Sequence, residues 1–391
     1  MTTKVLFIFP DFSKSLGVRN KIVSKLNHIS DLSPLELHVL ILGDEGAELR
    51  NDFNPNIRIY YTGRPTVKSR LLRLTIFWSW LFEKEYQRLF REAKKVYDQV
   101  GADFVVMRDT PGSNSLFLFC KAISNKAQLI IELNSDLLEE KRMLYKRDEA
   151  NKWNKLAWQK EAATKPKILK AAKNLVCVSD EIAHIHHNRY RLPKNRFRVI
   201  TNGIDYKSRR LAKMPDNHNE LKCVFLGGAG DSYYKVERAI ESLANYSGDT
   251  RVVLSVVGIE RENIEKPNHA VRFHPKVSHA ELGSYLDGQH LGISTLGLYK
   301  KNLENGSTLK VREYLMAGIP VVLGYSDVDF PEDCPYAFRV PNSDERLNFE
   351  SIFDYALGLY ANANLRSEIS DYFESKISME SKAQEFLALF N

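Results

Sequence analysis

The sequence predicts an α/β protein with two domains, each built around its own parallel sheet. Its 391 residues suit two or three domains of ordinary size. Short apolar runs typical of buried strands alternate with helical patterns in both halves of the chain, as in βαβ units. The alternation is interrupted at residues 206–220, a polar stretch that is rich in Lys and Arg and contains Pro215. We therefore expect residues 206–220 to be the linker between the two domains.

The first domain is predicted to span residues 1–205. It opens with a buried-strand pattern at Lys4–Pro10, after which a loop with Gly17 leads to helical spacing at residues 20–26. Further strand patterns follow at residues 35–42, 57–61, 104–107, 128–132, 174–179 and 197–200. Because helical segments separate these strands, we expect the strands to pair in parallel.

The second domain is predicted to span residues 221–372. Strand patterns recur in it at residues 222–227, 251–258, 270–273, 291–295 and 320–323. Helical patterns lie between them at residues 236–244, 279–286 and 310–316. The stretch 348–390 is helical throughout, with breaks near Asn362 and Ser375, and we treat residues 373–391 as a separate C-terminal helix.

The composition is that of a globular protein with a sizeable core, since 43% of the residues are hydrophobic and 27% are charged. The four cysteines are scattered and form no CxxC pair. Cys120, Cys177 and Cys223 lie in apolar runs, so we expect buried thiols and a reducing, cytoplasmic compartment. The first ten residues lack the features of a signal peptide, and no window approaches the length and apolarity of a membrane-spanning helix.

Positive charge is concentrated in the first half of the chain. The net charge is +7, yet residues 64–98 hold nine Lys/Arg against four Asp/Glu, and residues 139–173 hold eleven against five. These stretches indicate either a face for an anionic partner, such as a membrane surface, or a solvated surface. Residues 71–82, which include Trp78 and Trp80, fit an interfacial membrane helix or a core helix packed on the sheet.

The stretch from 290 to 322 has the pattern of an anion site. An apolar strand leads into a polar loop with Asn305, Gly306, Ser307 and Thr308, and a helix follows. Backbone N–H groups at a helix start favour negative charge, so the loop is a candidate for binding a diphosphate. Glu313, about one turn into the helix, could accept two hydroxyls of a ribose. The alternative interpretation is that Glu313 is an ordinary solvated helix residue.

A second glycine turn follows the strand pattern at 222–227. It contains Gly227, Gly228 and Gly230, and Lys235 comes shortly after, where a helix begins. The glycines would let a ligand approach the backbone, and Lys235 would offer a point charge to phosphate. The turn matches neither GxxxxGK[ST] nor GxGxxG. By itself this turn is a weak signal, but it is strengthened by the similar turn at Gly306.

Polar residues also follow the predicted strands of the first domain. Gly17 lies beyond the first strand, Arg108 ends the strand at 104–107, and Asn134 and Asp136 follow the strand at 128–132. Parallel sheets place ligands at the carboxyl ends of their strands, so these four residues are candidates for the second substrate. For Gly17, a plain turn glycine is an equal alternative.

Several other patterns carry less weight. Asp327 and Asp329 form a DxD string that holds a metal in some sugar-transferring enzymes, but two acids in a surface turn are common. Glu181, His184 and His187 share a helical face without further ligands nearby, so we predict no metal site. The chain contains no GxSxG elbow, and the basic aromatic stretch at 68–95 lacks any nucleic-acid-binding motif.

Four segments together resemble the retaining glycosyltransferases of family 4. The resemblance is strong from residue 199 to 322 and weak before 170. It rests on VITNGID at 199–205, on Phe225 to Gly227 with Lys235, on the helix pattern at 277–286, and on EYLMAGIPVV at 313–322. The resemblance implies the GT-B fold: two Rossmann-like domains facing across a cleft, with a C-terminal helix that crosses back to the first domain. It also implies that no metal is needed.

The resemblance assigns roles to individual residues. The second acid of the E-x7-E motif of the family falls on Glu313, which would bind the donor ribose. The first acid falls on Asn305, with Glu304 adjacent to it. The phosphate-binding lysine of the family matches Lys235. The arginine that accompanies this lysine falls on Gly228, so that charge is missing.

Other positions complete the implied site. Lys310, or the backbone amides of Ser307, Thr308 and Leu309, would compensate for the missing arginine. The Gly-Gly pair usual in the first loop of the family appears as Gly17 followed by valine, and the active-site histidine common in the first domain has Asn134 or Asp136 near its place.

The implied function is transfer of a sugar from a UDP- or GDP-sugar to a glycan or lipid-linked glycan, in the synthesis of a surface polysaccharide or glycoconjugate. Two alternatives follow from the departures at Asn305 and Gly228. One is a catalytically inactive relative that binds a nucleotide sugar or a glycan. The other is a different GT-B enzyme such as a sugar-nucleotide epimerase, against which the matches at Asn202–Gly203 and Glu313 speak.

Overall fold

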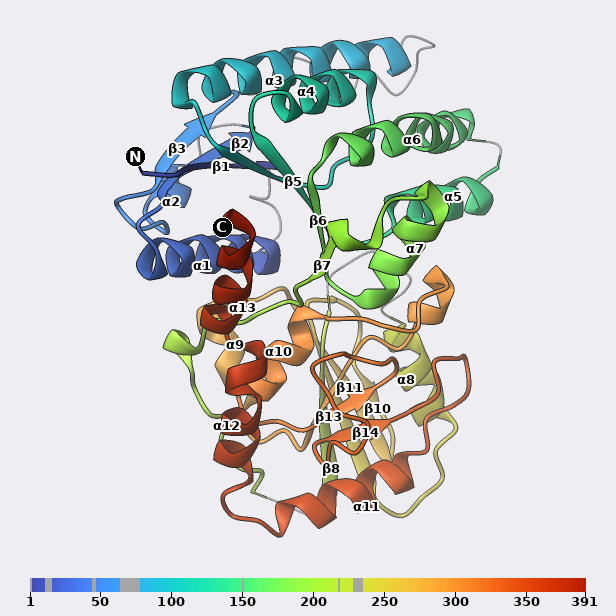
Figure 1. Ribbon diagram of the computed structural model, residues 1–391. Coiled ribbons are helices and arrows are strands. Elements are labelled where there is room, and N and C mark those ends of the chain that lie inside the picture. Colours follow the sequence, from blue (N-terminus) through green and yellow to red (C-terminus); the bar gives the residue numbers. More distant parts are fainter. Residues whose placement is uncertain are drawn as a thin grey trace. The chain divides into compact units, whose positions relative to one another are not determined.

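The computed structural model describes residues 2–10, 16–43, 47–63, 78–149, 151–216, 219–227 and 235–391. The chain divides into two compact units. Unit 1 comprises Met1–Ile200 together with Ala383–Asn391, and unit 2 comprises Thr201–Lys382. Each unit is an α/β sandwich with its own sheet, as the sequence predicts (Figure 1).

The sheet of unit 1 has the strand order β3-β2-β1-β4-β5-β6-β7. All six pairings in this sheet are parallel. Its strands are β1 (Lys4–Pro10), β2 (Glu36–Leu42), β3 (Arg58–Tyr61), β4 (Phe104–Arg108), β5 (Gln128–Leu133), β6 (Asn174–Cys177) and β7 (Phe197–Val199). The order reverses direction between β1 and β4, so the carboxyl ends of these two strands flank the point where open α/β sheets bind ligands.

Helices cover both faces of this sheet (Figure 1). They are α1 (Leu16–Leu32), α2 (Ala47–Arg50), α3 (Trp78–Val100), α4 (Asn114–Ser124), α5 (Leu137–Arg147), α6 (Lys152–Ala171) and α7 (Asp180–Tyr190), with a short 3-10 turn η2 (Lys194–Arg196) before β7. Apolar residues of β1, such as Phe7, pack against α1 on one face. The same core contains Phe386 and Phe390 from the end of the chain, with the rings of Phe7 and Phe386 6.1 Å apart.

The sheet of unit 2 has the strand order β10-β11-β9-β8-β12-β13-β14. Its strands are β8 (Glu220–Leu226), β9 (Arg251–Val257), β10 (Ile264–Glu265), β11 (His269–His274), β12 (Leu291–Ile293), β13 (Val321–Leu323) and β14 (Ala337–Arg339). The pairings are parallel except that of β10 with β11. The order reverses between β8 and β12, which therefore mark the switch point of this unit.

The helices of unit 2 include two whose predicted bounds are the observed ones. They are α8 (Val236–Ala244), α9 (His279–Leu286), α10 (Leu309–Met316), α11 (Phe349–Tyr360), α12 (Leu365–Ile377) and α13 (Met379–Leu387), with 3-10 turns η3 (Tyr206–Ser208), η4 (Leu298–Lys301) and η5 (Ala388–Phe390). Helix α13 begins in unit 2, and its residues from Ala383 onward belong to unit 1.

The boundary between the units differs from the predicted one. The first crossing lies after Ile200 instead of after residue 205, and the return crossing lies at residues 382–383 instead of near 373. The predicted linker, residues 206–220, is part of unit 2. Its polar chain is held by hydrogen bonds from the Tyr206 hydroxyl to the Ser370 carbonyl and from the Ala212 amide to the Ala317 carbonyl. The polar sequence of residues 206–220 led to the prediction of a linker. Hydrogen bonds that involve backbone carbonyls hold the segment to unit 2, and the polarity of its side chains does not reveal them.

Local differences concern short or terminal elements. Helix α1 begins at Leu16, so Gly17 lies in its first turn and not in a loop. The two-residue strand β10 and the three-residue strand β14 were not predicted, since runs this short carry no periodicity. The C-terminal helices break at residues 361–364 and at Ser378, close to the predicted positions.

Residues 71–82, predicted to form either an interfacial helix or a core helix, fall largely outside the described residues. Helix α3 begins at Trp78, and the side chains of residues 78–82 are likewise outside the described part of the chain. Across the ranges given above, no helix has both the length and the apolarity needed to cross a membrane. The four cysteines are buried and carry unbridged thiols, as predicted for Cys120, Cys177 and Cys223.

A buried ion network in unit 2 holds α10 in place. The Arg312 guanidinium, fully buried, forms ion pairs with Asp327 through both terminal nitrogens and with Asp329. Its Nε donates to the Asn202 carbonyl at 3.1 Å, while the Thr201 hydroxyl donates to Asp329 at 3.1 Å. The DxD string was interpreted as a surface turn, and this interpretation is wrong: Asp327 and Asp329 are buried because they neutralise Arg312.

The Asn202–Gly203 motif joins the same network. The Asn202 amide donates to the Ser307 hydroxyl at 2.9 Å, and its side chain donates to the Ser307 carbonyl. At Gly203 a Cβ atom would lie 3.0 Å from Lys382 Cγ and 3.2 Å from Met379 Cα, so the start of α13 would have to move slightly to admit a side chain. The motif therefore connects the first residues of unit 2 to the start of α10 and to α13.

Removing the charge of Arg312 should destabilise unit 2 strongly. We expect Arg312→Met to cost about 3–5 kcal/mol of unfolding free energy, because Asp327 and Asp329 would remain buried without their cation. Urea unfolding followed by circular dichroism measures this cost. Arg346→Met, at an exposed position of the same unit, is the matched control and should stay within about 0.5 kcal/mol of wild type. A loss for Arg312→Met as small as that of the control would contradict the role of the network.

Candidate functional site

The helix starts predicted beside the two glycine turns lie at the switch point of unit 2. Strand β8 ends at Leu226 and its neighbour β12 ends at Ile293, and α8 and α10 begin beyond these ends. Lys235 lies immediately before α8, with a left-handed φ of 48°, and Glu313 lies within α10. Two helix N-termini, one lysine and one glutamate thus gather at one edge of a parallel sheet, where such folds bind ligands.

The start of α10 offers backbone donors. Thr308 is its N-cap, and the Thr308 side chain forms no capping hydrogen bond. Gly306 precedes it in a tight place, where a Cβ atom would lie 2.8 Å from Leu298 Cδ1. The Thr308 hydroxyl is 2.7 Å from that of Tyr325, and the Ser307 hydroxyl accepts from Asn202. For Ser307, the backbone amide is therefore the group to consider for an anion.

Glu313 lies in an unusual environment for a carboxylate. Its side chain is 20% exposed, and Oε1 lies 3.5 Å from Nδ1 of His279 at the start of α9. Burial raises the pKa of Glu313 to about 7. A carboxyl that exchanges its proton near neutral pH and reaches the surface is typical of a functional position, although burial in a structural role has the same effect.

Helix α10 is fixed on both sides of Glu313. Arg312 anchors it through the buried network, and the Tyr314 hydroxyl accepts from the Leu226 amide at 2.7 Å, at the end of β8. That hydroxyl also lies 3.3 Å from the Ile293 carbonyl at the end of β12. The residues flanking Glu313 therefore tie it to both strands of the switch point.

The remaining donor-side predictions fall in the same region. The Lys310 ammonium lies over the Phe225 ring, 3.8 Å from its centroid, and the Gly227 amide donates to the Val257 carbonyl at 2.8 Å. Asn305 forms an isolated parallel bridge with Ser326. Leu309 is the first residue of α10. Gly228 lies outside the described residues, as does Gly230.

Glu304, the alternative to Asn305 as the first acid, is held by a neighbouring loop. Asn342 donates from its side-chain nitrogen to the Leu303 carbonyl at 2.8 Å and to the Glu304 carboxylate at 3.2 Å. The Asn342 side-chain oxygen accepts from the Tyr299 amide at 3.0 Å. Residues 299–305 and the loop after β14 thus form one connected wall beside the start of α10.

Lys235 faces that wall. Its ammonium lies 3.2 Å from the Asp344 carboxylate, which also accepts from the Tyr299 hydroxyl. Sequence reasoning found Lys235 but missed Tyr299 and Asp344, because neither belongs to a motif and both are distant from it along the chain.

In unit 1 the predicted residues collect at the carboxyl ends of β4 and β5. Arg108 ends β4, and Asn134 follows β5 and accepts from the Lys21 ammonium at 3.2 Å. Asp136 is the N-cap of α5 and pairs with Arg189 at 2.6 Å, so its carboxylate is already engaged. Gly17, in α1, belongs to the element that also carries Lys21.

A carboxylate that sequence reasoning missed lies among these residues. Glu132 forms an ion pair with Lys25, and its pKa is lowered by Lys25, Lys21 and Arg108 against the opposing effect of burial. Burial lowers the pKa of Arg108, although Glu132 and Asp109 oppose the shift. Asp109 in turn pairs with the buried Lys165 at 2.5 Å. The strand ends of unit 1 therefore place three cations around one acid.

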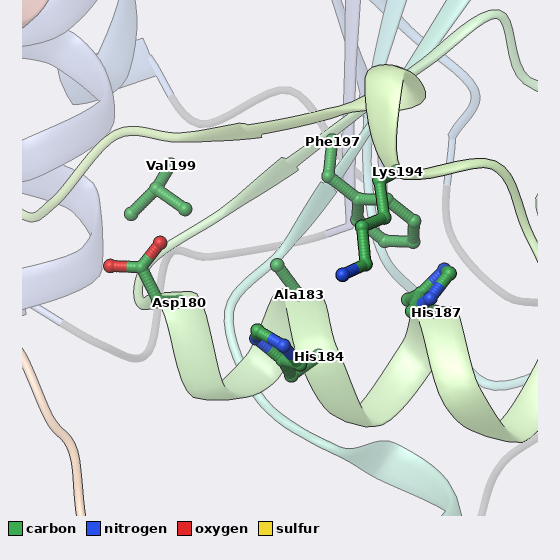
Figure 2. Close-up of a pocket in the computed structure, with 7 residues that line it drawn as sticks. All are labelled: Asp180, Ala183, His184, His187, Lys194, Phe197 and Val199. Carbon is green, nitrogen blue, oxygen red and sulfur yellow. The ribbon is translucent and has the colours of Figure 1, made fainter.

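A cavity of about 200 Å³ in unit 1 lies apart from all of these residues. It is bounded by α7 and the edge strand β7, and Figure 2 shows Lys194 and His187 near the ring of Phe197, with His184 earlier on α7. The His187 Nδ1 hydrogen-bonds to the Leu192 carbonyl at 2.5 Å. The cavity is smaller than typical ligand pockets, and we assign it no substrate. Glu181 does not line it, and over the described ranges no His, Cys, Asp and Glu side chains group as metal ligands do.

Two Rossmann-like units of this topology define the GT-B fold. The sequence profile of Glycosyltransferase Family 4 matches residues 35–208, which confirms the resemblance predicted from the motifs. A search of curated proteins finds no match to the chain.

Solved structures share the fold along the whole chain. A glycosyltransferase from Rickettsia africae has 13% sequence identity and a TM-score of 0.64, covering 100% of this chain and 98% of that one. The HepE protein of Anabaena, solved in complex with UDP and glucose, has 12% identity and a TM-score of 0.62, with 99% of each chain covered. Sucrose-phosphate synthase of Thermosynechococcus elongatus has 12% identity and a TM-score of 0.62, covering 99% and 98%. These likenesses establish the GT-B fold.

The raised pKa of Glu313 predicts a pH-dependent stability. Between pH 4.5 and about 7 the folded protein keeps the Glu313 proton while the unfolded chain releases it, so stability falls as the pH rises. Glu313→Gln removes this effect. We expect the variant to gain roughly 1–3 kcal/mol relative to wild type between pH 5 and pH 8. Urea unfolding at both pH values measures the gain, with Glu241→Gln on the exposed side of α8 as control. An equal difference at both pH values would contradict the assignment.

Proposed function

We propose that the protein is a retaining glycosyltransferase that moves a hexose from a UDP- or GDP-sugar to a glycan or lipid-linked glycan. The observation that carries this proposal is that Lys235, the start of α10 and Glu313 follow the neighbouring strands β8 and β12 at the switch point of unit 2. A diphosphate binds to positive charge and backbone N–H donors, and the hydroxyls of a ribose bind to a carboxylate. The Anabaena HepE structure, which has the same fold, contains UDP.

The site supplies electrostatic stabilisation without a metal in this proposal. As the bond between the sugar C1 and the diphosphate oxygen breaks, its electron pair moves to that oxygen. Lys235 and the amides of Thr308 and Leu309 stabilise the negative charge that develops there. The acceptor hydroxyl forms the new bond to C1 on the same face and loses its proton to the leaving oxygen. This stereochemical course follows from the family resemblance.

Glu313 has a binding role in the proposed reaction. Its carboxylate accepts hydrogen bonds from the two ribose hydroxyls, which fixes the nucleotide relative to the start of α10. Because the pKa of Glu313 is raised to about 7, the bound nucleotide would favour the ionised form by providing two donors. His279 is an exposed side chain whose Nδ1 lies 3.5 Å from Oε1, and it would border the ribose.

The strand ends of unit 1 supply the proposed acceptor side. Arg108, Lys21 and Lys25 surround Glu132, and Asn134 adds a side-chain amide. Asp136 contributes indirectly to this side, because it caps the start of α5 and forms an ion pair with Arg189. This charge balance suits an acceptor that carries phosphate or carboxylate, in line with a lipid-linked glycan of a surface polysaccharide or glycoconjugate.

A second candidate function is nucleotide-sugar or glycan binding without turnover. It is favoured by Asn305 and Gly228, which replace the acid and the arginine of the family motifs. Incubation with UDP- and GDP-sugars separates the two candidates, because an enzyme releases the nucleoside diphosphate by slow hydrolysis or by transfer, whereas a binder is only stabilised by the ligand.

Glu313→Ala should abolish transfer while leaving the fold intact. The variant loses the ribose contact, so we expect the turnover of the best nucleotide sugar to fall at least about 100-fold. Release of UDP or GDP, measured by a coupled assay, gives the rate, and far-ultraviolet circular dichroism checks the fold. Glu241→Ala is the matched control and should keep the wild-type rate. Full activity of Glu313→Ala would refute the assignment of this site.

The basic first half also predicts peripheral contact with an anionic membrane. We expect the protein to float with vesicles that contain phosphatidylglycerol, and to float less after replacement of Trp78 and Trp80 by alanine, because interfacial tryptophans and basic residues act together. Vesicles of phosphatidylcholine alone are the control. Equal flotation of wild type and the double variant would contradict the hypothesis of an interfacial helix.

A further inference from the structure

The diphosphate side of the proposed site lacks one expected charge. Where the family resemblance places an arginine beside its lysine, this chain has Gly228. A nucleoside diphosphate carries more than one negative charge at neutral pH, and Lys235 alone offers one positive charge. The inference below deepens the proposed function and rests on it, since it concerns the same ligand.

A second lysine lies beside Lys235. In the 3-10 turn η4, which follows β12, the Tyr299 hydroxyl binds the same Asp344 carboxylate as Lys235, and Lys300 is the next residue of this turn. Lys300 is partly buried, and its side chain is close enough to interact directly with that of Lys235. Burial lowers the pKa of Lys300, and the neighbouring charge of Lys235 lowers it further. Two ammonium groups held together repel each other unless an anion lies between them.

In this structure the anion is Asp344. One of its oxygens lies 3.2 Å from Lys235 Nζ and accepts from the Tyr299 hydroxyl, and its negative charge also acts on Lys300. Burial and the hydrogen bond to Asp344 raise the pKa of Tyr299 to about 12, so the phenol keeps its proton and remains a donor. Lys235, Lys300 and Tyr299 would together suit one phosphate group, since they provide two cations and one hydroxyl donor.

The loop that carries Asp344 is firmly held. The buried Arg238 of α8 donates to the carbonyls of Glu345 at 2.5 Å and Pro341 at 3.0 Å, on either side of Asp344. Asn342 ties the same loop to Tyr299 and Leu303. The Asp344 side chain itself is 65% exposed. The carboxylate can therefore turn into solvent while its backbone keeps its place.

We propose that Lys300 is the second cation for the diphosphate, in place of the missing arginine, and that Asp344 occupies part of this subsite until the nucleotide displaces it. The exchange is favourable because an exposed ion pair contributes little in water, whereas a phosphate brings more charge and several acceptor oxygens to the same donors. Tyr299 then donates to the phosphate as it now donates to Asp344. The subsite is assembled from α8, η4 and the loop after β14, all within unit 2.

The first experiment replaces Lys300. Isothermal titration calorimetry of the full-length protein with UDP, GDP and inorganic pyrophosphate compares wild type with Lys300→Ala and with Lys266→Ala, an exposed lysine of the same unit that controls for lost charge. We expect Lys300→Ala to weaken the better-binding nucleotide and pyrophosphate roughly tenfold or more, and Lys266→Ala to change neither by more than about twofold. Uridine or guanosine, which lacks phosphate, should bind both variants as it binds wild type.

The second experiment replaces Asp344, the residue proposed to occupy the phosphate subsite in the absence of the nucleotide. Asp344→Asn removes the competing charge while keeping the shape of the side chain, so we expect nucleoside diphosphate affinity to rise several-fold. Asp354→Asn, an exposed acid on α11, is the control and should leave affinity unchanged. A fall in affinity for Asp344→Asn would show that Asp344 positions Lys235 for the ligand, and would overturn the displacement.

The outcomes separate this inference from the proposed function. Tight UDP or GDP binding that is unaffected by Lys300→Ala overturns the role of Lys300 and leaves the glycosyltransferase proposal standing. Binding of pyrophosphate alone, lost in Lys300→Ala, supports the anion subsite and counts against a nucleotide-sugar enzyme. The absence of binding for all three probes overturns both.

Discussion

The arrangement of unit 2 depends on the burial of one guanidinium. Arg312 lies inside the protein only because Asp327 and Asp329 lie there with it, and because the carbonyl of Asn202 accepts from its Nε. A buried ion pair contributes little net stability compared with apolar packing, yet it is costly to break and therefore specifies a unique geometry. That geometry places the start of α10, the first residues of unit 2 and the loop after β13 in one fixed relation.

The proposed donor site is a consequence of this fixed relation. Arg312 and Tyr314 are the neighbours of Glu313, and they hold α10 to the ion network and to the ends of β8 and β12. Ser307, which binds Asn202, fixes the loop just before the helix. Glu313 and the helix amides are thus positioned by side chains that have no contact with the proposed ligand, as a binding site requires when its groups must be aligned before the substrate arrives.

Much of the fold, but less of the site, could be predicted from the sequence. Apolar periodicity located α8 at its observed bounds because this helix buries one face, and the glycine turns led to Lys235 and Glu313. The role of Asp327 and Asp329 was missed because it depends on Arg312, on another element. Lys300, Tyr299 and Asp344 were missed for the same reason: each is an ordinary surface residue in its local sequence, and only the sheet order brings them to Lys235.

Asp329 links the two places where the chain passes between the units. Thr201, the first residue of unit 2, donates to this carboxylate at 3.1 Å, and Lys382, the last, lies 3.4 Å from the same oxygen. Both covalent connections therefore leave unit 2 from a common anchor, which the Arg312 network keeps rigid. Loss of the Asp329 carboxylate would therefore remove a side-chain contact from both ends of unit 2 at once.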